Sequence, residues 1–174
     1  MKKIFLLFLL LFSCNMLNAQ YRSSNDIKST WVDIGTGIFT HTNTVDRGGT
    51  VLNFAVNNST NNKMYRVRFN FAKELDWFVD RPEYNISNGI LFGKEFNINR
   101  FDFYLLGGVG FMSGAQRKSA TSYIYYSTPS IPIELDIRYA AFKKLGFSLS
   151  VFGEVNGVNP MRGIIIKSNF GEFR

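Results

Sequence analysis

Hydrophobic and polar residues alternate along short segments of the chain. In the segment SIPIELDIRYAAF, residues 130–142, apolar residues and one tyrosine take the odd positions from 131 to 139. Proline, glutamate, aspartate and arginine take the even positions between them. A period of two places successive side chains on opposite faces of a β-strand. The segment is therefore predicted to form a strand with one apolar face and one mostly charged face.

The same alternation recurs along the rest of the chain, and turn residues separate the segments. It predicts eight strands, at residues 30–41, 50–57, 64–72, 86–96, 101–112, 131–140, 146–155 and 162–171. An earlier start of the sixth strand, within SYIYYS at 122–127, stays open. No segment shows the period of 3.6 residues that indicates a helix. Many short, evenly spaced strands predict a single all-β domain, either a sandwich or an up-and-down barrel.

The predicted connectors favour the barrel because they alternate in length. The connectors NSTNNK, NINR and AFKKL are short and polar. TNTVDRGG, KELDWFVDRPEYN and the stretch from Ser113 to Ser130 are longer, and only the last connector, NGVNP, breaks the pattern. An up-and-down barrel with both chain ends on one side has short turns at one rim and longer loops at the other.

The kind of polar residue on the strands indicates which face points inward. A barrel that carries an apolar ligand in water has Lys, Glu and Thr in the middle of its outer faces. Here most lysines lie in connectors or at strand ends, and the polar faces hold Gly, Ser, Asn and charges of both signs. Eight strands leave an interior just wide enough to be filled by side chains. The prediction is an all-β, eight-stranded antiparallel up-and-down transmembrane β-barrel whose apolar faces contact lipid.

Charged residues on the inward faces are expected to pair, because a buried charge is tolerable only when it is paired and hydrogen-bonded. The sequence predicts an ionic network in the lumen that is made of Asp33, Arg66, Arg68, Asp102, Glu134, Asp136, Arg138, Glu154 and Lys167. Such a network would fill and close a polar interior.

The first residues, MKKIFLLFLLLFSCNMLNAQ, have the pattern of a secretory signal peptide. Lys2 and Lys3 precede an apolar stretch that is too short to span a membrane, and Ala19 precedes the expected cut. The predicted domains are a signal peptide at 1–19, a short N-terminal segment at 20–29 and the barrel at 30–174. Cys14 lies in LFSC, which loosely resembles a lipoprotein cleavage site, so acylation there stays an alternative. A cut after Ala19 leaves a mature chain without cysteine, and hence without disulfides.

The net charge excludes one class of partner. The formal net charge is +7, and without Lys2 and Lys3 it is +5, from 18 basic and 13 acidic residues. The longest basic cluster is KK at 143–144. Nucleic-acid binding needs a basic patch or stripe, so no nucleic-acid partner is predicted. A mildly basic chain is attracted instead to an anionic membrane surface.

These features together resemble the small outer-membrane β-barrel family of Gram-negative bacteria. The resemblance rests on the signal peptide, the eight strands, IPIELDIRYAAFKKLGFSLSVFGEVN and the terminal GIIIKSNFGEFR, and covers the chain from about Ser29 onward. In general pattern the chain is similar to the OmpA membrane domain and OmpX. The resemblance implies a monomer in the outer membrane, surrounded by its lipid, after secretion through the inner membrane. In that family the last strand usually ends in an aromatic residue, whereas this chain ends Phe173-Arg174.

Candidate chemistry is sparse. His41 is the single histidine, and it is not part of the His-x-Ser pattern that lipid-modifying enzymes of this architecture need. The acidic residues Glu74, Asp76, Asp80 and Glu83 match no calcium-loop spacing. The sequence therefore predicts no catalytic, cofactor-binding or metal-binding residue.

Aromatic residues gather in the predicted outer loops, and exposed aromatics favour binding to an extracellular protein or glycan. These candidates are Trp77, Phe78, Tyr84, Tyr123, Tyr125 and Tyr126. The predicted function is a non-enzymatic outer-membrane barrel with an occluded polar lumen, either structural or binding through its extracellular loops. Two alternatives stay open. One is a soluble or lipid-anchored periplasmic β-barrel that carries an apolar ligand, and the other is a lipid-modifying outer-membrane enzyme that uses His41.

Overall fold

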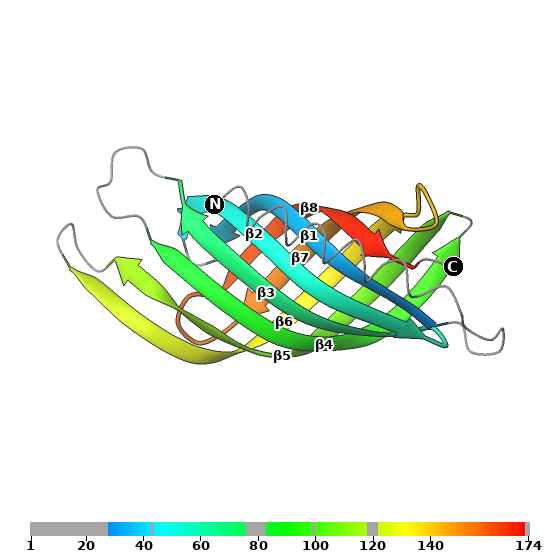
Figure 1. Ribbon diagram of the computed structural model, residues 1–174. Coiled ribbons are helices and arrows are strands. Elements are labelled where there is room, and N and C mark those ends of the chain that lie inside the picture. Colours follow the sequence, from blue (N-terminus) through cyan, green and yellow to red (C-terminus); the bar gives the residue numbers. More distant parts are fainter. Residues whose placement is uncertain (1–27, 43, 76–82, 99, 118–121, 173–174) are drawn as a thin grey trace, which may run out of the picture.

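The computed structural model of the protein describes residues 28–42, 44–75, 83–98, 100–117 and 122–172. These residues form eight antiparallel strands that close into one barrel (Figure 1). The strands are β1 (Lys28–His41), β2 (Thr44–Thr60), β3 (Lys63–Glu74), β4 (Tyr84–Ile98), β5 (Phe101–Arg117), β6 (Tyr123–Tyr139), β7 (Leu145–Val155) and β8 (Met161–Gly171). In this part of the chain no helix is long and apolar enough to cross a membrane.

Each strand pairs with the next one along the chain, and β8 returns to pair with β1. β2 is followed by β3, β4 by β5 and β6 by β7 at one end of the barrel, which we call the turn rim. β1 is followed by β2, β3 by β4, β5 by β6 and β7 by β8 at the opposite end, which we call the loop rim. The eight-stranded, antiparallel up-and-down barrel that the alternation predicted is confirmed.

Two strands begin or end well outside their predicted bounds at the loop rim. β2 begins at Thr44, so the prediction that TNTVDRGG forms a long connector is wrong. β5 continues to Arg117, so most of the stretch from Ser113 to Ser130 is strand rather than loop. The Gly, Ser and Thr residues in these segments are typical of turns. Hydrogen bonding to the neighbouring strand, as in the pairing of Gly49 with Phe39, keeps them extended.

The β5–β6 hairpin reaches beyond its neighbours at the loop rim (Figure 1). β5 and β6 pair as far as Arg117 and Tyr123, whereas the pairing of β6 with β7 stops at Ile131. The SYIYYS segment thus belongs mostly to β6, as its alternation suggested. Residues 123–130 of β6 pair with β5 but not with β7.

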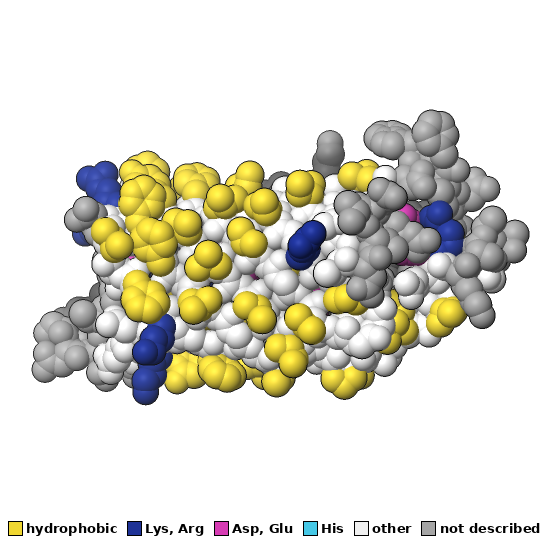
Figure 2. Space-filling model, turned by 180° about the vertical axis from the view of Figure 1, so that it is seen from behind, with side chains coloured by type: hydrophobic (Ala, Val, Ile, Leu, Met, Phe, Trp, Pro, Cys, Tyr) yellow, Lys and Arg dark blue, Asp and Glu magenta, His cyan; other side chains and the backbone are white. Residues whose placement is uncertain are grey.

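Apolar side chains cover the outer face, whereas the interior holds the buried charged side chains together with two smaller apolar clusters. The outward, exposed set includes Leu52, Phe54, Phe69, Ile90, Leu105, Val109, Ile131, Leu135, Leu149 and Ile166. Figure 2 shows hydrophobic side chains spread over one face of the barrel, with Lys and Arg side chains mostly toward its two ends. This distribution is the reverse of the one in a water-soluble barrel, and it matches the apolar band of barrels that stand in a bilayer.

Candidate functional sites in the lumen and at the loop rim

Arg66 on β3 is the central side chain of the lumen. Its guanidinium donates hydrogen bonds from Nη1 to Glu134 Oε1 at 2.6 Å and from Nη2 to Asp136 Oδ2 at 2.7 Å. Nη2 also donates to Asp33 Oδ2 at 3.1 Å, and Nε donates to Asn57 Oδ1 at 2.6 Å. One cation is therefore bound by three carboxylates that come from β1 and β6.

Glu134 on β6 connects Arg66 to the rest of the lumen. It accepts hydrogen bonds from Lys167 Nζ, from Ser150 Oγ at 2.5 Å and from Arg68 Nη1 at 3.4 Å. Arg68 also binds Glu154 on β7 through Nη2. These bonds run from β3 to β6, β7 and β8, so they join walls that are distant along the sheet.

The charged side chains at the centre of the barrel form what we call the lumen network, which consists of Asp33, Arg66, Arg68, Glu134, Asp136, Glu154 and Lys167. Each of them is at most 1% exposed. Removing one partner from such a buried pair is strongly destabilising, because the other charge then lacks compensation away from water. The structure thus brings seven of the nine predicted lumen residues together in one connected group at the centre of the barrel.

The remaining two predicted lumen residues form a separate pair nearer the turn rim. Arg138 donates to Asp102 Oδ2 from Nε at 3.0 Å and from Nη2 at 2.5 Å. Its guanidinium also lies 4.1 Å from the ring centre of Trp31 and 5.1 Å from that of Tyr104. The contact between Arg138 and Trp31 was not predicted. The alternation does place Trp31 on the inward face of β1, two residues before Asp33, and this spacing could have indicated it.

A second charged cluster lies inside the loop rim. Glu74 Oε2 accepts hydrogen bonds from Arg117 Nη2 at 2.8 Å and from the backbone N–H of Glu83 at 3.1 Å. Glu83 in turn accepts from the backbone N–H of Arg117 at 2.6 Å and lies 4.0 Å from His41 Nε2. His41 is only 3% exposed and contacts Phe39 edge to face. The single histidine is therefore inside the barrel and not on its apolar outer face.

The described acidic residues of the β3–β4 connector bind protein groups. Glu74 and Glu83 hold Arg117, while Asp76 and Asp80 lie outside the described residues. Within the described ranges, no group of three or more His, Cys, Asp or Glu side chains is placed to hold a metal ion.

The aromatic candidates lie on strands where the structure describes them. Tyr84 begins β4 and is exposed, and Tyr125 on β6 is 75% exposed. Tyr123 opens β6, whereas Tyr126 points inward and donates its hydroxyl to Asn85 Oδ1. Burial raises the pKa of Tyr126. The other two candidates, Trp77 and Phe78, lie outside the described residues.

Comparison with known proteins identifies the fold. Protein-family models give no match to this chain, and neither do the curated protein sequences. Solved structures do match. Neisserial surface protein A superposes with a TM-score of 0.66 at 10% identity, over 86% of this chain and 100% of that chain.

Two further solved structures support the same fold. The N-terminal β-barrel domain of Pseudomonas aeruginosa OprF gives a TM-score of 0.57 at 12% identity, over 82% of this chain and 97% of that chain. Ail of Yersinia pestis gives 0.53 at 14% identity, over 87% of this chain and 100% of that chain. The chain therefore has the fold of small outer-membrane β-barrels, and the predicted architectural resemblance is confirmed.

Proposed function

We propose that this protein is a non-enzymatic barrel of the bacterial outer membrane that is closed inside by the lumen network and binds a partner outside the cell at its loop rim. The proposal rests mainly on the distribution of side chains, which is the reverse of that in a water-soluble barrel. Apolar side chains are exposed around the wall, and the seven charged side chains of the lumen network are each at most 1% exposed. In a bilayer every backbone polar group needs an internal partner, and a closed barrel supplies one.

The interior argues against a soluble carrier of an apolar ligand. Such a carrier needs a concave apolar cavity with only a few polar groups. Here Arg66, Arg68 and Lys167 meet carboxylates across the lumen. An apolar ligand placed there would break these ion pairs and could not form hydrogen bonds to the separated charges.

The position of His41 supports a non-enzymatic role. A catalytic base must come within hydrogen-bond reach of the proton that it removes. A lipid substrate lies against the outer wall, whereas the His41 ring is buried between Phe39 and Glu83. The geometry therefore favours a structural role for His41 at the rim.

The β5–β6 hairpin is the proposed binding element. Tyr125 is 75% exposed, and residues 123–130 offer a strand edge beyond the reach of β7. Exposed edges accept an added peptide strand, and aromatic side chains supply contact area for a partner. These features favour an extracellular protein partner. A glycan is the alternative, since the similar fold of Ail has been solved in complex with the heparin analogue sucrose octasulfate.

Two measurements test this function. Membrane fractionation should place the protein in the outer membrane, and the unboiled protein should migrate differently from the boiled one on a detergent gel. A chain in the soluble fraction that shows no such shift would contradict the membrane assignment.

A shortened β5–β6 hairpin tests the binding role. Replacing Ser113–Ser127 with Asn-Gly joins the paired residues Met112 and Thr128 through a two-residue turn. This change removes Tyr125 and most of the strand edge that β7 does not cover. Cells that carry this variant should keep the gel shift but lose attachment to immobilised extracellular-matrix proteins. Equal attachment of cells with the full and the shortened hairpin would contradict the role of the hairpin. Loss of attachment to immobilised heparin alone would identify a glycan as the partner.

A further inference from the structure

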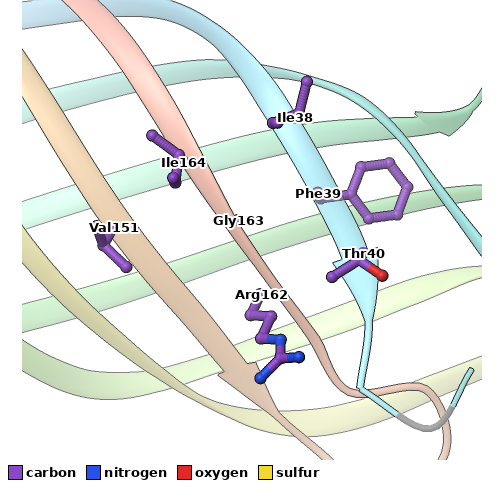
Figure 3. Close-up of a pocket in the computed structure, with 7 residues that line it drawn as sticks. All are labelled: Ile38, Phe39, Thr40, Val151, Arg162, Gly163 and Ile164. Carbon is purple, nitrogen blue, oxygen red and sulfur yellow. The ribbon is translucent and has the colours of Figure 1, made fainter. Parts of the chain in front are cut away.

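A hollow of about 350 Å³ lies on the outer wall of the barrel, over β8 and between β1 and β7 (Figure 3). Ile38, Val151 and Ile164 line it, and the strand register places Ile164 between the other two. All three are exposed, and Ile38 is 64% exposed. Arg162 and Thr40 also line the hollow and are register partners on β8 and β1.

The charged and apolar parts of the hollow follow an order along the barrel axis. β8 starts at the loop rim with Met161, so Arg162 lies near that rim. Ile164 is two residues further along, roughly 7 Å nearer the middle of the wall. A lipid of the outer leaflet has the same order, with its headgroup at the outer surface and its acyl chains toward the middle of the bilayer.

The strand beside Arg162 leaves room for a ligand. Gly153 on β7 pairs with Arg162, and a Cβ added to Gly153 would meet nothing within 4 Å. Glycine weakens a strand interior, and in that place it often marks the close approach of another molecule. Open space therefore adjoins Arg162 on the side of β7.

The charges of the outer surface favour an anionic ligand. Among the residues whose side chains the structure describes (29–42, 48–75, 83–98, 100–117 and 122–172), no Asp or Glu side chain is exposed. The exposed basic residues in these ranges are Lys63, Lys73, Lys94, Arg100, Lys143 and Arg162. Of these, Arg162 alone lines the hollow. A guanidinium binds phosphate through two parallel hydrogen bonds, which makes phosphate the fitting headgroup.

We propose that this hollow binds a phosphorylated lipid of the outer leaflet. Arg162 holds the phosphate, and one acyl chain lies along Ile38, Ile164 and Val151. The inference rests on the proposed insertion of the barrel in the outer membrane and adds a defined lipid site to it.

Native mass spectrometry of the full-length protein, released from detergent micelles, tests the site with two matched probes. The probes are bisphosphorylated lipid A and the same lipid A after removal of both phosphates. We expect a one-to-one adduct with the phosphorylated probe and about tenfold weaker binding of the dephosphorylated probe, which corresponds to the loss of one charge-assisted contact.

Two variants remove different parts of the site. Arg162→Gln removes the charge, and Gly153→Val fills the adjoining space without a clash. Each should lower binding of the phosphorylated probe about tenfold. Both positions lie on the outer face, so both variants should fold and keep the gel shift of the unboiled protein.

The matched controls are Lys73→Gln and Gly107→Val. Lys73 is exposed at the loop-rim end of β3, away from the hollow, and Gly107 is an outward glycine where an added Cβ would also meet nothing within 4 Å. Both controls should bind like the unaltered protein. Equal losses in Lys73→Gln and Arg162→Gln, or equal binding of the two probes, would overturn the proposal while leaving membrane insertion intact. A soluble protein without a gel shift would overturn insertion itself.

Discussion

Arg66 shows how single residues hold this interior together. Its guanidinium binds Glu134, Asp136 and Asp33 at once, and all four side chains are at most 1% exposed. Low-dielectric surroundings strengthen each of these bonds, and they make an unpaired charge correspondingly costly. The stability of the barrel should therefore depend on Arg66 far more than on the exposed cations at the rims.

The variant Arg66→Gln should lower the free energy of unfolding by about 3–5 kcal/mol, because it leaves three buried carboxylates without their shared cation. Urea titration of the refolded protein in micelles, with the unboiled gel shift as the measure of folding, checks this expectation. Arg100→Gln is the matched control at an exposed position of the turn rim, and its change should stay within about 0.5 kcal/mol. Equal effects of the two variants would show that the lumen network contributes little.

Leu135 gives the corresponding test for the outer wall. Its side chain is exposed, and its partners Leu105 and Val151 are also outward and apolar. Leu135→Arg should cost about 2–4 kcal/mol when folding is measured in phospholipid vesicles, because the charge then lies within hydrocarbon.

Val155→Arg is the control for Leu135→Arg on the same face. Val155 ends β7 at the loop rim, where an arginine should cost about 0–1 kcal/mol because it reaches the interface. A protein that works in water would tolerate both arginines equally, and that result would contradict membrane insertion.

At the scale of elements, the β2–β3 turn has a definite backbone requirement. Asn61 and Asn62 both have positive φ, 50° and 63°, as a two-residue type I′ turn demands. Asn62→Val should lower the free energy of unfolding by about 1–2 kcal/mol, because a β-branched residue is disfavoured in the left-handed region. Asn62→Gly should be neutral or stabilising, and the same urea titration distinguishes the two. A loss with glycine as large as that with valine would mean that the asparagine side chain itself is needed.

The observed strand lengths show where a local sequence pattern fails to predict the ends of a strand. Strands β7 and β8 agree with the alternation to within a residue at each end, because turn residues such as Asn156, Gly157 and Pro160 separate them. β2 and β5 extend further than predicted, since GG and SGAQR carry no alternating signal. Pairing with the strand beside them decides their conformation.

At the scale of the whole molecule, closure of the sheet brings β1 against β8 and creates the lumen. Contacts such as the hydrogen bond from Asn169 to Asp33 join residues far apart in the chain. The charged groups of the lumen network then connect β3 to β6, β7 and β8, where an ion would have to pass.

The ion pairs of the lumen network predict that the barrel does not conduct ions. In planar lipid bilayers the purified protein should insert without giving regular single-channel steps, because its ion pairs leave the centre occupied. Recordings of the unaltered protein check this expectation, with a porin as the positive control for insertion. Stable, uniform steps would contradict an occluded lumen.

The alternation along the chain predicts the number of strands and nine of the inward charges, because a period of two fixes the face on which each side chain lies. It did not predict that Glu74 and Glu83 are buried at the loop rim. Only the tertiary structure decided which charges meet. Arg66, Glu134 and Asp33 come from strands that no local pattern relates, whereas Asp102 and Arg138 form a pair apart from them. The hollow beside Arg162 likewise exists only where β1, β7 and β8 lie side by side. Register and closure are properties of the complete sheet, and they depend on all eight strands at once.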